Sequence, residues 1–206
     1  GEGVARTFLY TTLMAGCRYD EATAVLRESS AIRFDPIHRA YQEALIRFWQ
    51  SGSPSGVNDW LAGLPAAEPS DSLRFNWACL QGDASGIVRL SSEASNDNDT
   101  LMLCLAFIAT GQMERGHQTL VNLRTRLDAL VAEQPESYFY WASLARVLAY
   151  MGEGAKALEA AEKACAIEPE GRDALYGLPV SAVRAEVLGW IGRGDDANRE
   201  LARLLR

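Results

Sequence analysis

Apolar side chains recur every three or four residues between positions 138 and 150, which predicts a helix with a single apolar stripe. Gly152 is expected to end this helix, because glycine adopts the left-handed conformation at little cost. A second helix is predicted over 156–167, ended by Pro169, and its small residues let two helix backbones approach closely: Ala157, Ala160, Ala161 and Ala164. The pattern predicts an antiparallel helical hairpin, which cannot bury its own stripe and requires neighbours.

Weaker copies of this hairpin recur along the chain, each with a glycine at the predicted turn. The first and last of these glycines are 176 residues and five steps apart, about 35 residues per step. The steps range from 29 to 41 residues, so the array is irregular. In the first copy, the helix after the turn fits the pattern better when counted from Cys17. The predicted turn glycines are Gly16, Gly52, Gly82, Gly111, Gly152 and Gly192.

The spacing within 138–171 resembles that of the 34-residue tetratricopeptide repeat (TPR), with Trp141, Gly152 and Pro169 among the matching positions. The resemblance implies an all-α fold, a right-handed α-α superhelix of about five to six TPR-like helical hairpins that forms a single solenoid over 1–206. Residues 172–206 are also similar to the C-terminal TPR regions of bacterial signalling and regulatory proteins. The approximate units are 3–36, 37–66, 69–96, 97–135, 138–171 and 173–206.

In TPR proteins the first helix of each hairpin lines a concave groove, and counting back from the turn glycines identifies the expected peptide-binding residues. Aromatic and arginine side chains on such a surface are typical binding anchors. An alternative is that the aromatic residues of the set only pack against the next hairpin. The expected groove residues are Arg39, Gln42, Ile46, Trp49 and Gln50 in the second unit and Phe139, Arg146 and Tyr150 in the fifth.

Charge and hydropathy restrict the partners. The net charge of −7, without clustered Lys or Arg, predicts that this region binds no nucleic acid, and it leaves room for basic peptides. The longest apolar run, 101–109, is too short to cross a bilayer and predicts a buried helix, so no membrane contact is expected. The four cysteines form no C-x-x-C pair and are interpreted as buried thiols in the reducing cytoplasm.

The sequence contains no pattern of residues that is typical of a catalytic site. His38 and His117 have no second ligand at helical spacing, which argues against a metal site. No phosphate-binding glycine motif and no nucleophile–base arrangement can be nominated. We therefore expect no catalytic residues, no metal and no cofactor.

The sequence thus predicts a non-enzymatic protein–protein interaction scaffold that binds a peptide or protein segment in its groove, as part of a bacterial regulatory protein. The partner would be another protein, another domain of the same full-length chain or another copy of the chain. The alternative function is self-association or intramolecular docking. The predicted last helix, 195–206, has no following helix to cover its flank. Either another subunit or a longer chain covers this end, or its outward residues Arg199, Glu200 and Arg203 are polar enough.

Overall fold

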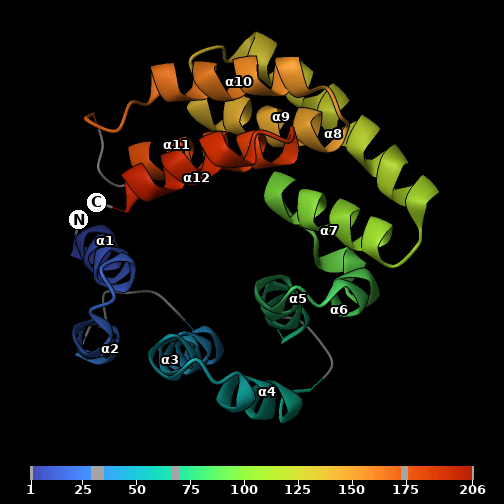
Figure 1. Ribbon diagram of the computed structural model, residues 1–206. Helices are drawn as coiled ribbons and strands as arrows, with labels where there is room; N and C mark the ends of the chain where they lie inside the picture. The colour runs from blue at the N-terminus through green and yellow to red at the C-terminus, as the bar shows by residue number, and fades with distance from the viewer. Residues whose placement is uncertain (1, 29–34, 66–69, 173–175, 206) are drawn as a thin grey trace. The chain divides into compact units, whose positions relative to one another are not determined.

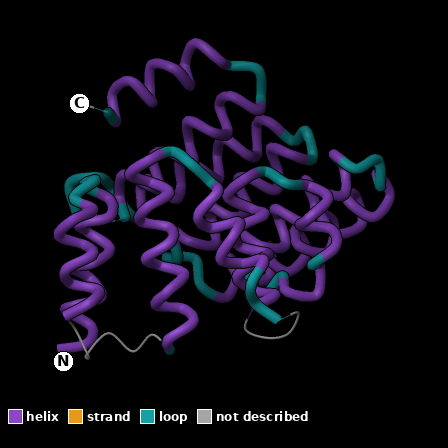
Figure 2. The backbone as a smooth tube through the Cα atoms, turned by 90° about the horizontal axis from the view of Figure 1, so that it is seen from below, coloured by secondary structure: helices purple, strands orange, loops and turns teal. Residues whose placement is uncertain are grey.

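The computed structural model describes residues 2–28, 35–65, 70–172 and 176–205. Within these ranges the chain consists of helices joined by loops, and no strand occurs (Figure 2). The prediction of an all-α fold built from helical hairpins is therefore confirmed. The contacts divide the chain into two compact units, Gly1–Trp77 and Ala78–Arg206, which we describe one at a time. One continuous solenoid with a right-handed twist remains a prediction.

The first unit contains two hydrophobic cores that share helix α3. Ile46 of α3 belongs to the core of the hairpin formed by α1 and α2, whereas Tyr41 of the same helix packs with α4 and α5. Asp35 starts α3 by accepting hydrogen bonds from the backbone amides of Ile37 and His38. The helices of this unit are α1 (Glu2–Ala15), α2 (Tyr19–Glu28), α3 (Pro36–Ser51), α4 (Ser55–Ala62) and most of α5 (Ser70–Gln81) (Figure 1).

The second unit contains one large core, to which α7, α8, α9, α10 and α11 all contribute. Each of these helices lies against the next one along the chain, and α9 also contacts α7 and α11. The helices that follow α5 are α6 (Ala84–Arg89), a short 3-10 helix (Ser91–Glu93), α7 (Asp97–Ala109), α8 (Met113–Glu133), α9 (Tyr138–Tyr150), α10 (Gly154–Ile167), α11 (Gly177–Trp190) and α12 (Gly194–Leu204).

The hairpin turns use left-handed backbone at the positions that the glycine pattern predicts, with one shift. In the first turn the left-handed residue is Cys17, with φ of 54°, and not Gly16. This agrees with the better fit of the first unit when counted from Cys17. Left-handed backbone disfavours a side chain, which explains why glycine is present at the other five turns: Gly52, Gly82, Gly111, Gly152 and Gly192.

Small residues permit close approach between paired helices. The four alanines predicted to form the buried face of α10 are all buried, and α10 contacts both α9 and α11. Gly116 has the same role in α8, because a Cβ atom there would lie 2.7 Å from Ile108 Cγ1 of α7 and 3.1 Å from the carbonyl oxygen of Cys104. Close contact between helix backbones thus depends on particular small residues.

Helices α7 and α11 both begin with residues suited to a first turn. The N-cap of α7 is Asn96, whose side chain accepts from the amide of Asp99. Helix α11 begins at Gly177 and carries Pro179 in its first turn, where proline is tolerated. Residues 173–175, which precede this helix, lie outside the described residues.

We predict that Gly152→Ala lowers the free energy of unfolding by about 1 kcal/mol, because alanine is strained at positive φ. The φ of Gly152 is 79°, and a Cβ atom there would meet no other atom within 4 Å, so strain is the only expected cost. Gly194→Ala is the matched control, since this residue is helical and equally open. Urea unfolding should show the control to be neutral or more stable. Equal losses in both variants would contradict the prediction.

Candidate functional site

Helices α7, α9 and α11 are the first helices of three successive hairpins, and α9 contacts both of the others (Figure 1). α9 and α11 run in the same direction. Tyr138 at the start of α9 lies against Tyr176, and Tyr150 at its end lies against Trp190. Equivalent positions in these two hairpins are 40 residues apart, as are Gly152 and Gly192. This row of helices carries the predicted binding residues of the fifth unit.

Arg146 and Tyr150 both bind Glu186 of α11. Arg146 Nε donates to Glu186 Oε2 at 2.9 Å, and the Tyr150 hydroxyl donates to Glu186 Oε1 at 2.6 Å. Burial, and then the bond to Glu186, raise the pKa of Tyr150, so its hydroxyl remains a donor at neutral pH. The Tyr150 ring also meets Trp190 edge to face, with centroids 4.6 Å apart. The alternative interpretation, packing against the next hairpin, therefore describes Tyr150.

Phe139 and Arg146 line a recess between α7, α8 and α9. Phe139, one of the residues that line the recess, is 53% exposed. The floor of the recess is apolar and includes Leu127 and Val147, both fully buried. The recess has a volume of about 160 Å³, and its lining residues are Asp97, Asn98, Leu101, Leu123, Leu127, Phe139, Ser143, Arg146 and Val147.

The five residues predicted in the second unit face other helices of the first unit or solvent. Arg39 donates to the carbonyl oxygen of Leu26, Gln42 accepts from the Tyr10 hydroxyl at 2.8 Å, and Gln50 donates to Asp20 at 2.9 Å. Ile46 is 2% exposed and packs in the α1–α2 core. Trp49 is 47% exposed, and its ring lies tilted against that of Phe48, with centroids 4.9 Å apart. The structure thus places Ile46 in the core and leaves Trp49 as the large accessible residue.

Several residues at the row were not predicted from the sequence. Glu186 and Trp190 are the equivalents, 40 residues on, of Arg146 and Tyr150, so extending the count from Gly152 to Gly192 would have identified them. Asn98 and Ser143 complete the polar rim of the recess. No signal in the sequence marks these two, because they are ordinary polar residues whose placement depends on how α7 packs beside α9.

None of the three cysteines in the second unit has the lowered pKa of a reactive nucleophile. Burial raises the pKa of Cys79 and Cys104 to about 11 and also raises that of Cys165. These side chains are therefore protonated at neutral pH and lack the thiolate that a reactive cysteine requires.

Across the described ranges, no three His, Cys, Asp or Glu side chains are grouped so that they could hold a metal ion. None of the described helices combines the length and hydropathy needed to cross a membrane.

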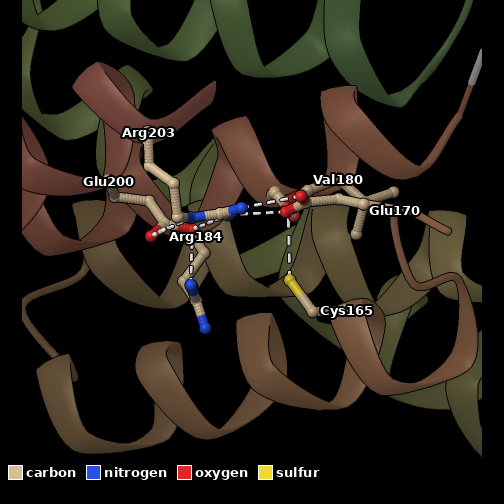
Figure 3. Close-up of polar contacts among 7 residues, drawn as sticks. Cys165, Glu170, Val180, Arg184, Glu200 and Arg203 are labelled. Atoms are coloured by element: carbon tan, nitrogen blue, oxygen red, sulfur yellow. Dashed lines mark hydrogen bonds and ion pairs between the residues drawn. The ribbon is translucent and has the colours of Figure 1, made fainter. Parts of the chain in front are cut away.

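A second polar cluster joins α12 to the loop after α10 (Figure 3). The Arg203 guanidinium binds both oxygens of Glu170, at 2.7 Å and 2.5 Å, and the Ser181 hydroxyl donates to the same carboxylate. Glu200 accepts from Arg203 and from Arg184 of α11. Arg184 is thus accommodated by an ion pair between α11 and α12.

Comparisons with known proteins are limited to distant structural likeness. No protein-family model matches the sequence, and the curated proteins contain no match. Among solved structures, the chain is similar to MamA of AMB-1, with 15% identity, a TM-score of 0.31 and coverage of 97% of this chain and 94% of that one. It is also similar to a protein of Podosopora anserina described as a kinesin light chain with nearly identical TPR-like repeats, with 15% identity, a TM-score of 0.35 and coverage of 98% and 92%.

The Glu170 cluster predicts an acid-dependent loss of stability. Hydrogen bonds from Arg203 and then Ser181 lower the pKa of Glu170 from 4.5 to about 2. A lowered pKa stabilises the fold above the unfolded value, and this contribution is lost as pH falls from about 4.5 towards 2. The difference in unfolding free energy between wild type and Glu170→Gln should therefore shrink over that range in urea titrations.

Arg203→Ala serves as the matched variant for that measurement. It should also destabilise the protein at neutral pH, and the double variant should lose less than the sum of the two single variants, because both remove the Glu170–Arg203 interaction while Arg203→Ala also removes the bond to Glu200. A difference between wild type and Glu170→Gln that stays constant from pH 7 to about 2 would contradict the assignment.

Proposed function

We propose that this protein is a non-enzymatic scaffold that binds a segment of a partner protein along the row of α7, α9 and α11. The architecture of the second unit, in which successive hairpins contact each other, is typical of protein–protein interaction modules. The single observation that carries the proposal is the recess beside Phe139, in which an exposed aromatic ring adjoins a buried apolar floor.

The size of the recess fits one large apolar side chain of the partner. An engineered apolar cavity of about 150 Å³ holds a benzene molecule. The recess here is of similar volume, about 160 Å³, and the exposed residue Phe139 is part of its lining. A leucine or phenylalanine inserted there would be buried against Leu127 and Val147, which is the arrangement of a binding hot spot.

The rim of the recess supplies polar groups for the backbone of the bound segment. Asn98 and Ser143 each offer a donor and an acceptor, and Arg146 offers donors. Arg146 is already fixed by Glu186 at 2.9 Å, so it loses little side-chain freedom when a ligand binds. These groups suit an extended peptide whose backbone needs partners on both its N–H and C=O groups.

The cellular role follows from the resemblance of residues 172–206 to the C-terminal TPR regions of bacterial regulatory proteins. We place the scaffold in the cytoplasm, as the module through which such a protein engages its partner. The net charge of −7 favours partner segments with basic residues flanking the apolar anchor.

Selection from a phage-displayed library of random 12-residue peptides tests the proposal. The enriched peptides should share one large apolar residue, and their affinity should fall about tenfold or more for Phe139→Ala. Ser143→Phe, which adds bulk beside the recess, should weaken them as well. Affinities are measured by fluorescence anisotropy with labelled synthetic peptides.

Met113→Ala is the control, because Met113 is a large exposed apolar residue of α8 that does not line the recess. It should leave the affinities unchanged. Peptides that bind all variants alike, or a library that yields no specific peptide, would contradict the assignment of the recess.

A further inference from the structure

A second surface, distinct from the recess, lies on the outer side of the last hairpin. It is a groove of about 620 Å³ between α11 and α12. Trp190 and Leu201 at this groove are 56% and 44% exposed. Within the unit Ala78–Arg206, the main helix contact of α12 is with α11. The lining residues are Ala182, Ala185, Glu186, Gly189, Trp190, Gly194, Ala197, Asn198 and Leu201.

The same groove exists one hairpin earlier, and there it is filled. The equivalents of the lining residues, 40 positions back, lie on α9 and α10 and pack against α11. Ala161, the equivalent of Leu201, is 1% exposed. Gly154, the equivalent of Gly194, is covered so closely that a Cβ atom there would lie 3.1 Å from Ile191 Cγ2, whereas one at Gly194 would meet nothing within 4 Å.

The occupant of the earlier groove shows what the shape accepts. It is helix α11, which runs antiparallel to α10, since Ile191 lies over Gly154 and the Val180 carbonyl oxygen accepts from the Cys165 thiol. α11 inserts a narrow stripe of β-branched residues, spaced for one helix face: Val180, Val183, Val187 and Ile191. The open groove keeps small residues at five of the equivalent positions, and so favours a helix of the same kind: Ala182, Ala185, Gly189, Gly194 and Ala197.

Charge distinguishes the open groove from the filled one. In the filled groove the charged lining residue facing α11 is Arg146, and α11 brings Glu186 to it at 2.9 Å. In the open groove this position is Glu186 itself, the one charged side chain among its lining residues. Glu186 is already bound by Arg146 and Tyr150 but is partly exposed, so a helix docked in the same way is favoured when it carries a basic and not an acidic residue where α11 carries Glu186.

We infer that the α11–α12 groove docks an amphipathic helix of a partner protein, with a valine- or isoleucine-rich stripe and a basic residue opposite Glu186. A second copy of this chain fits less well, because α11 would bring Glu186 towards Glu186. The helix lies parallel to α11 and antiparallel to α12, as α11 does on α9 and α10.

Two synthetic peptides test this docking on the intact protein. One has the sequence of residues 176–193, and the other is identical except for Glu186→Arg. Fluorescence anisotropy should show the arginine peptide to bind about two- to fivefold more tightly, with the preference weakening in high salt. Tighter binding by the native-sequence peptide would overturn the inference, because it would mean that the peptide replaces α11 beside Arg146.

Gly189→Leu blocks the groove without straining the helix, since a Cβ atom at Gly189 meets only Ala197 Cβ at 4.0 Å. This variant should weaken the arginine peptide about tenfold or more. Asn198→Arg, which adds a cation to the lining, should weaken it too. Ala129→Leu, on an exposed position of α8, is the control and should bind like wild type. Circular dichroism checks that each variant is folded.

Light scattering of the protein alone completes the experiment. We expect the mass of a monomer, unchanged by Gly189→Leu. A dimer that Gly189→Leu dissociates would show that a second copy occupies the groove and would overturn the inference. Equal affinity of the arginine peptide for wild type and Gly189→Leu would overturn it as well.

Discussion

The packing of α10 between α9 and α11 is the constraint on which the second unit depends. Its buried face consists of alanines, so the backbones of its neighbours can approach closely on both sides. The left-handed turn at Gly152 then returns the chain antiparallel to α9. Because α11 must insert its valine stripe over these alanines, the position of α11 beside α9 is fixed, and with it the pairing of Arg146 and Tyr150 with Glu186.

This arrangement gives α11 two functions in the structure. One face fills the groove of the preceding hairpin, and the other forms a similar groove with α12 that is open in the described part of the unit. The row of first helices also creates the recess beside Phe139, whose floor belongs to the common core. Both candidate binding surfaces are therefore consequences of stacking hairpins with small residues at their seams, and they can be altered by separate substitutions.

The repeat could be predicted from the sequence because its signals are local. Turn glycines require a particular φ, and alanines at helical spacing mark close helix contacts, so five turn positions and the α9–α10 hairpin were identified. Contacts between hairpins were harder to predict, since they depend on the register of one helix on another. The sequence therefore nominated Phe139 and Arg146 for the inner face but also Ile46, which the structure buries in a core. Glu186 could have been predicted, since it lies 40 residues after Arg146, as Gly192 does after Gly152.

The close packing of α9 and α11 on the buried alanine face of α10 is tested most directly by comparing the unfolding free energies of Ala161→Leu and Ala166→Leu in urea. Ala161 is buried between helices, whereas Ala166 lies on the exposed side of the same helix. If the alanine face sets the distances from α10 to α9 and α11, Ala161→Leu should destabilise the protein by about 1–3 kcal/mol through overpacking. Ala166→Leu should have little effect. Equal stability of the two variants would contradict the account.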